Sequence, residues 1–62
     1  MEKTLYQRVL QLAAEQRRSL EEPCLELHCT VCEFEQRLTA LEPEVLLVVD
    51  RWLGTAWRRL WD

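Results

Sequence analysis

Apolar side chains recur at helical spacing in three consecutive segments of the chain, and this period constrains the fold more than any other feature. Steps of three and four residues place each set on one face of an α-helix. The sets are Leu5, Val9, Leu12, Ala13 and Leu20; then Leu27, Val31, Phe34, Leu38 and Leu41; and then Val45, Leu46, Val49, Trp52, Leu53, Ala56, Trp57 and Leu60. We therefore expect three helices, at about residues 3–19, 23–40 and 43–61.

A strand is the competing interpretation of the second segment, because apolar residues alternate from Leu25 to Val31. The alternation fails further on, where Glu33 and Glu35 would fall on the apolar side. The helical period continues to Leu41 without such a conflict. The sequence therefore favours a helix here.

Short polar stretches separate the three segments and carry start signals for helices. The N-cap candidates are Thr4, Ser19 and Thr39. Thr39 and Glu42 have the spacing of a capping box, and Pro23 and Pro43 can occupy first turns because a proline needs no hydrogen-bond partner there. Gly54 lies inside the third segment and predicts a bend or a close helix contact.

Short connections between three helices predict an all-α fold, a small up-down-up bundle that forms a single domain over residues 1–62. A chain of 62 residues buries proportionally little of its surface. The apolar arc of the third segment is wider than two neighbouring helices would cover. We therefore expect a homodimer or a protein partner to complete the bundle.

The charges are unevenly distributed along a chain whose net charge is -3. Residues 21–50 contain eight acidic residues and one basic residue, Arg37, which gives a local charge of -7. This acidic segment argues against nucleic acid as a partner. The basic flanks can pair with it, either within one chain or across a dimer.

Three cysteines and no recognisable secretory leader in residues 1–20 predict a cytoplasmic or other reducing intracellular compartment. In such a compartment the thiols would be free or would bind a metal. The longest apolar run, from Val45 to Val49, is far too short to span a bilayer.

The stretch "HCTVC" at His28 to Cys32 raises the question of a metal site. On a continuous helix Cys24, His28 and Cys32 would share one face, and Cys29 would point elsewhere. Zinc prefers four ligands, so one chain would have to present Cys29, Cys32, Cys24 and His28 at once, or two chains would have to share the ion. The alternative is that no cofactor binds, that Cys24 and Cys32 fill the border of the core, and that His28 lies on the surface.

Enzymatic constellations are absent from the sequence, and we expect no catalytic activity. The chain has one histidine, no asparagine, Ser19 as its single serine, and one glycine, which leaves no triad and no phosphate-binding loop. Thioredoxin-type chemistry is not expected either, because no strand precedes the CxxC pair and the local charge is acidic.

The middle of the chain resembles the N-terminal zinc-binding segment of papillomavirus E6 proteins. The matching residues are Leu25, Leu27, Cys29, Cys32, Leu38, Thr39 and Glu42, and "TLYQRVLQLA" falls where the first helix of that family would be. The resemblance implies a zinc-dependent viral regulatory adaptor that binds acidic, leucine-rich helices of host proteins. The family completes its zinc site with a second CxxC, and residues 43–62 contain none.

The end of the chain, "DRWLGTAWRRLWD", combines tryptophan and arginine, which are enriched at binding hot spots. We expect a small non-enzymatic protein-binding module, an adaptor, inhibitor or regulator, that acts through this third helix. The expected contact residues are Val48, Trp52, Trp57, Arg58, Trp61, Tyr6 and Leu10. Core packing is one alternative for the tryptophans. A helix on a membrane surface is another, which the net charge disfavours.

Overall fold

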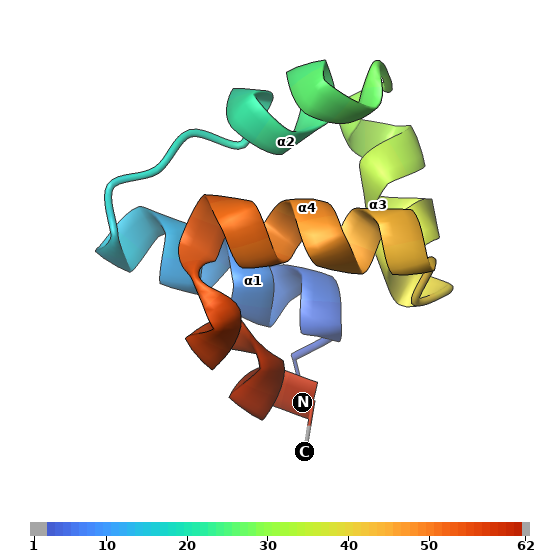
Figure 1. Cartoon of the computed structure of the whole chain (residues 1–62). Helices are drawn as coiled ribbons and strands as arrows, with labels where there is room; N and C mark the ends of the chain where they lie inside the picture. The colour runs from blue at the N-terminus through green and yellow to red at the C-terminus, as the bar shows by residue number, and fades with distance from the viewer. Residues whose placement is uncertain (1–2, 62) are drawn as a thin grey trace.

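The computed structural model describes residues 3–61, and the side chains of residues 3–60 (Figure 1). This part of the chain is helical and contains no strand, which confirms the predicted all-α fold. The elements are α1 (Leu5–Glu15), α2 (Glu21–Leu27), α3 (Val31–Thr39), α4 (Pro43–Leu53) and the 3-10 helix η1 (Thr55–Trp61).

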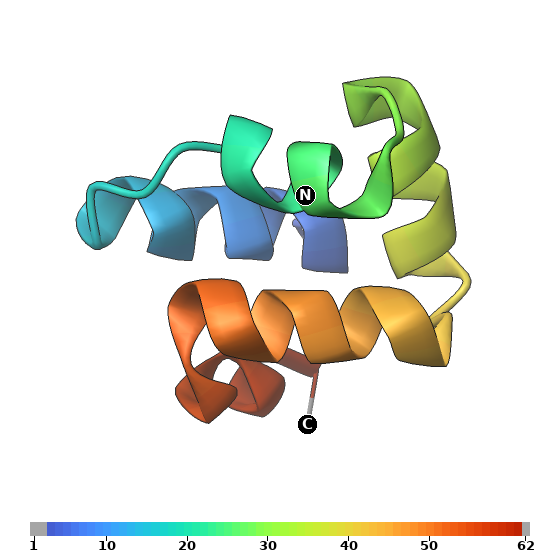
Figure 2. The same cartoon turned by 45° about the horizontal axis from the view of Figure 1, so that its top comes forward.

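Helix α4 lies at the centre of the molecule and packs against α2, α3 and η1. Helix α1 packs against α3 and η1. In both views α1 and α4 run in the same direction and α2 runs in the opposite direction, whereas α3 crosses one end of the molecule (Figures 1 and 2). The crossing of α3 distinguishes this arrangement from the predicted bundle of three long helices.

The predicted second helix, at about residues 23–40, is wrong because the chain stops being helical at His28. His28 adopts a left-handed conformation with φ 54° and ψ 45°. Its N–H donates to the Leu25 carbonyl at 3.2 Å, and the Cys29 N–H donates to the Cys24 carbonyl at 3.1 Å. These two bonds form a Schellman motif, which satisfies the last carbonyls of α2 and turns the chain away.

A new helix, α3, begins directly after this turn because Thr30 and Glu33 form a capping box. The Thr30 hydroxyl accepts the Glu33 N–H at 3.1 Å, and the Glu33 carboxylate accepts the Thr30 N–H at 3.0 Å. The restart moves Val31 off the predicted apolar stripe and leaves it 48% exposed. Leu41, at the other end of that stripe, is also 48% exposed.

The other helices end in the same way or at glycine. Arg17 (φ 59°) and Leu41 (φ 57°) are left-handed, like His28, and follow α1 and α3. The first helix therefore ends at Glu15, earlier than predicted. Gly54 ends α4 with φ 83°, so the predicted bend is confirmed and the predicted third helix at about residues 43–61 becomes α4 and η1.

The predicted N-caps have mixed outcomes. Thr4 forms a capping box with Gln7. Ser19 is not the N-cap of α2, which is Leu20 without a side-chain cap, although the Ser19 hydroxyl accepts the Glu21 N–H at 3.2 Å. The capping box predicted for Thr39 and Glu42 is wrong. Thr39 lies in the last turn of α3 and donates its hydroxyl to a carbonyl of that helix, while Glu42 precedes α4 without a side-chain cap.

One hydrophobic core joins all the helices. Its buried members are Val9, Ala13, Cys24, Leu27, Phe34, Leu38, Val45, Val48, Val49, Trp52, Leu53 and Trp57. Phe34 lies near its middle, with Tyr6 and Trp52 in edge contact at ring-centroid distances of 6.3 Å each. Trp52 Nε1 is buried without a hydrogen-bond partner among the described residues, and nothing in the structure explains it.

Asp50, in α4, forms hydrogen bonds with two side chains of η1. Its carboxylate accepts the Trp57 Nε1–H at 2.6 Å and two N–H groups of the Arg58 guanidinium, from Nε at 2.9 Å and Nη2 at 2.7 Å. From the other side, Arg8 of α1 donates to the Leu60 carbonyl at 2.7 Å. The C-terminal segment is therefore anchored to two different helices.

Replacing His28 with glycine tests the break between α2 and α3. Because only glycine adopts a left-handed conformation without steric cost, we expect His28→Gly to raise the free energy of unfolding by about 0.5–1 kcal/mol and His28→Val to lower it by about 1 kcal/mol. Urea unfolding followed by circular dichroism measures both. Glu35→Gly, in the exposed middle of α3, is the matched control and should lower the free energy of unfolding by about 1 kcal/mol. A continuous helix at His28 would make His28→Gly destabilising too.

Acidification tests the attachment of η1. The hydrogen bond from Arg58 lowers the pKa of Asp50 and that from Trp57 adds to it, against burial, which raises it. A lowered pKa in the folded state stabilises the fold above the unfolded pKa of about 3.9, and this stabilisation is lost as the pH falls through the folded value.

We expect Asp50→Asn to lower the free energy of unfolding by about 1 kcal/mol at neutral pH, since Arg58 is partly exposed. The difference in the free energy of unfolding between wild type and Asp50→Asn should shrink as the pH falls from about 5 to about 2. Urea titrations across this range measure it. A difference that stays constant with pH would contradict the role given to the Asp50 carboxylate.

Candidate functional site

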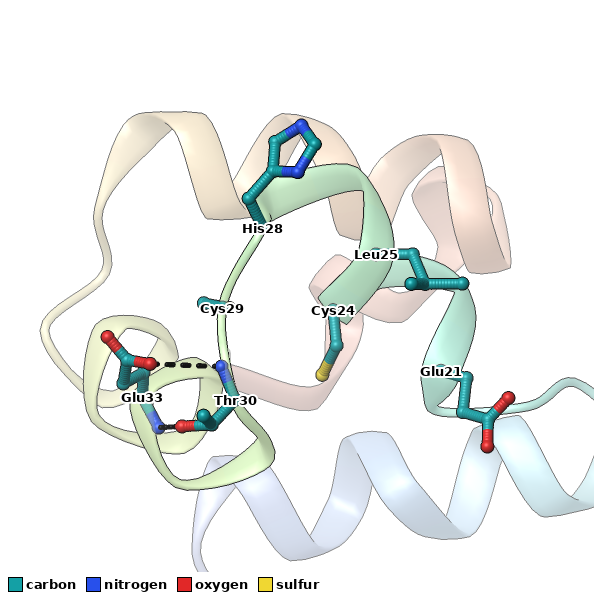
Figure 3. Close-up of a pocket in the computed structure, with 7 residues that line it drawn as sticks. All are labelled: Glu21, Cys24, Leu25, His28, Cys29, Thr30 and Glu33. Atoms are coloured by element: carbon teal, nitrogen blue, oxygen red, sulfur yellow. Dashed lines mark hydrogen bonds between the residues drawn. The ribbon is translucent and has the colours of Figure 1, made fainter.

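The break between α2 and α3 forms a pocket of about 350 Å³. Its lining residues come from both helices and the turn between them: Glu21, Cys24, Leu25, His28, Cys29, Thr30 and Glu33. Most of these side chains are exposed, so the pocket opens to solvent. Figure 3 shows Glu21 and Glu33 at opposite sides of it.

Two thiols lie in this pocket, and they are not the pair that a continuous helix would bring together. Cys24 is buried and Cys29 is half-buried, and both line the pocket. Burial raises the pKa of the Cys24 thiol, and the neighbouring Cys29 raises it further. The Cys29 N–H also donates to the Cys24 carbonyl at 3.1 Å, so the two residues are close neighbours.

The predicted face of Cys24, His28 and Cys32 does not exist, because the left-handed turn separates its members. Cys32 is exposed on α3 and is not among the residues that line the pocket. The imidazole of His28 points away from the Cys24 thiol (Figure 3).

The candidate ligands do not fit a zinc site in one chain. Zinc binds its ligands at about 2.0–2.3 Å and prefers four of them. Across residues 3–61 no group of three or more His, Cys, Asp or Glu side chains converges on a point where a metal could sit. We derive no role for zinc within one chain.

Two carboxylates flank the pocket without an ion-pair partner among the described side chains, Glu21 and Glu33. Hydrogen bonds from the Thr30 backbone and side chain lower the pKa of Glu33, so it is ionised at neutral pH. Leu25 also lines the pocket, near Glu21 on the exposed side of α2, with 71% of its surface accessible (Figure 3). The sequence did not lead us to predict that Glu21, Leu25 and Glu33 line a common pocket. The available signal was the capping-box spacing of Thr30 and Glu33, which marks the start of a new helix.

The contact residues predicted for the third helix lie elsewhere. Val48, Trp52 and Trp57 are at most 5% exposed, so they serve the core of the chain itself. The prediction that Val48 contacts a partner is wrong, because several elements cover α4 and bury this side chain. Arg58 is bound to Asp50. The side chain of Trp61 lies outside the described residues.

On α1, Tyr6 packs against the core and Leu10 is half-buried. Leu10 is not among the residues packed against the core, so it keeps part of its apolar surface accessible. Burial of Trp52 and Trp57 also contradicts a Trp-rich helix that lies on a membrane. In the described part of the chain, no helix combines the length and the apolar character needed to cross a bilayer.

The accessibility of the thiols predicts their order of alkylation. We expect iodoacetamide to modify Cys32 first, Cys29 next and Cys24 at least ~10-fold more slowly than Cys32, because burial limits access and lowers the thiolate fraction of Cys24. Tandem mass spectrometry of tryptic peptide 19–37, which contains all three cysteines, measures the three rates from its fragment ions over time. The control is the chain in guanidinium chloride, where the rates should converge. Equal rates in the folded chain would contradict the burial of Cys24.

Comparison of the chain with protein-family models, curated proteins and solved structures finds no match. The resemblance to papillomavirus E6 proteins therefore stays a hypothesis that rests on the residues quoted above.

Proposed function

We propose that the chain is a small non-enzymatic protein-binding module that takes a short basic peptide with an apolar anchor residue at the pocket between α2 and α3. The observation that carries this proposal is an exposed leucine, Leu25, in a pocket flanked by two unpaired carboxylates. A solvated leucine beside a hollow gains free energy when a partner covers it.

The size and chemistry of the pocket suit one apolar side chain. A volume of about 350 Å³ lies at the lower end of the range of ligand pockets. Leu25, Cys24 and Cys29 offer apolar surface, and the backbone around them is fixed by the Schellman motif and by the Thr30 cap. A preformed site of this kind loses little conformational entropy on binding.

Charge determines the kind of peptide. Elsewhere in the described chain, five carboxylates are paired internally: Arg18 with Glu22, Arg37 with Glu42 and Glu44, Arg51 with Glu26, and Arg58 with Asp50. Glu15 and Glu35, which lie outside the pocket, also form no ion pair among the described side chains. Glu21 and Glu33 form no ion pair among the described side chains, although Thr30 hydrogen-bonds the Glu33 carboxylate and Arg37 attracts it. Both carboxylates can therefore meet lysine or arginine on a partner. Such complementarity favours a basic segment and repels an acidic one.

This charge opposes the partner that the E6 resemblance implies, an acidic leucine-rich helix. Two carboxylates at the pocket would repel a third from the partner. Zinc dependence is likewise no part of the proposal, because the candidate ligands do not converge. A second copy of the chain is the alternative partner.

The test is binding of a fluorescently labelled peptide that has one leucine between lysines, followed by polarisation. We expect binding that weakens with salt, at least a ~10-fold loss on Leu25→Ser, and a loss of about 2- to 5-fold on Glu33→Gln. Glutamine keeps the capping box, so Glu33→Gln removes charge without removing the helix start.

Leu47→Ser is the matched control, because Leu47 is also exposed, at 57%, but lies on α4 outside the pocket. It should leave the affinity unchanged. Peptides with glycine in place of leucine, or glutamate in place of lysine, should not bind. Equal losses for Leu25→Ser and Leu47→Ser, or no binding of the basic peptide, would overturn the proposal. Light scattering on the free chain shows whether a second copy occupies the pocket instead.

A further inference from the structure

The end of α2 places two cysteines at the two ends of one backbone motif. In a Schellman motif the N–H of the second residue past the helix binds the carbonyl five residues earlier. Here these residues are Cys29 and Cys24, with the left-handed His28 between them. Side chains at these two positions commonly contact each other.

The same motif at the end of α3 shows that such side chains meet in this chain. The Glu42 N–H donates to the Arg37 carbonyl at 3.2 Å, and Leu41 is the left-handed residue. The Arg37 Nε and Glu42 Oε1 atoms lie 3.0 Å apart. Cys24 occupies the same position in the motif of α2 as Arg37 does in the motif of α3. Cys29 likewise corresponds to Glu42.

From this geometry we propose that Cys24 and Cys29 form a reversible disulfide that staples the end of α2. A main-chain bond of 3.1 Å between the two residues keeps their Cα atoms within about 7 Å, the upper limit for a disulfide. Both residues line the open pocket, so a small oxidant reaches Cys29 without unfolding of the chain. The inference does not depend on the peptide-binding proposal.

The oxidant is a low-molecular-weight disulfide such as oxidised glutathione. The Cys29 thiolate attacks one glutathione sulfur, which forms a mixed disulfide and releases one glutathione thiolate. The Cys24 thiolate then attacks the Cys29 sulfur of the mixed disulfide and releases the second glutathione thiolate. Overall, two cysteine S–H bonds and one glutathione S–S bond are replaced by one protein S–S bond and two glutathione S–H bonds. The protein loses two electrons and two protons, and glutathione takes up both.

Cys32 is the competing partner, because Cys29 and Cys32 form the CxxC pair. Cys32 lies on the exposed side of α3 beyond the Thr30 cap and does not line the pocket. A bond between Cys29 and Cys32 would have to span the capping box of Thr30 and Glu33. The Schellman geometry therefore favours Cys24.

The test is equilibration of the full chain in glutathione redox buffers, acid quenching, and peptide mapping by mass spectrometry. We expect a Cys24–Cys29 disulfide in the wild type. Cys32→Ser should form it with an equilibrium constant within about 2-fold of wild type, whereas Cys24→Ala should lower intramolecular disulfide formation at least ~10-fold and leave mixed disulfides with glutathione.

Mapping of the wild-type bond to Cys29 and Cys32, or a Cys32→Ser chain that stays reduced or carries only glutathione, would overturn the proposal. Circular dichroism of each reduced variant reports whether it folds. If the Cys24→Ala chain does not fold, the wild-type map and the Cys32→Ser chain still determine the outcome, since neither alters the buried Cys24.

Discussion

The left-handed backbone of His28 is the constraint on which the rest of this structure depends. A right-handed conformation there would continue α2 into α3 and put Cys29 and Cys24 on different sides of one helix. The left-handed turn instead closes α2 with two backbone hydrogen bonds and lets Thr30 start a new helix in another direction. The pocket, its exposed Leu25 and the neighbouring thiols all result from that change of direction. A residue with a side chain pays a steric cost in this conformation, so the surrounding contacts must hold it.

The helical period of the apolar residues was sufficient to predict the fold class, because Phe34, Leu38 and Val49 lie on the apolar faces that this period defines and are buried in the core. It did not predict the break at His28, since glycine is the residue that most often signals a left-handed helix end, and none stands here. The capping-box pattern of Thr30 and Glu33 was the available signal for a restart, but the apolar stripe continued through it. The cysteine neighbours and the pocket could not be predicted because both depend on that break. The burial of Val48 and Trp57 depends on how η1 folds back after Gly54, which spacing does not encode.

The distribution of charge links the fold to the proposed function. Four arginines hold carboxylates within the described chain, and three of these pairs join the basic flanks to the acidic middle segment. These exposed pairs contribute little to stability individually, but they neutralise the acidic residues around them. What remains around the pocket is unneutralised negative charge beside an apolar surface. The same turn that builds the pocket also brings Cys24 and Cys29 together, so oxidation and peptide binding would act on one structural element.

The backbone chemical shifts of residues 24–34 in solution test the central claim most directly. The ¹³C shifts of the isotope-labelled chain should be helical up to Leu27, left-handed at His28, extended at Thr30 and helical again from Val31. Nuclear Overhauser contacts between the Cβ protons of Cys24 and Cys29 should accompany this pattern. Uninterrupted helical shifts from residue 24 to residue 34, without contacts between those two cysteines, would contradict the break and with it the pocket.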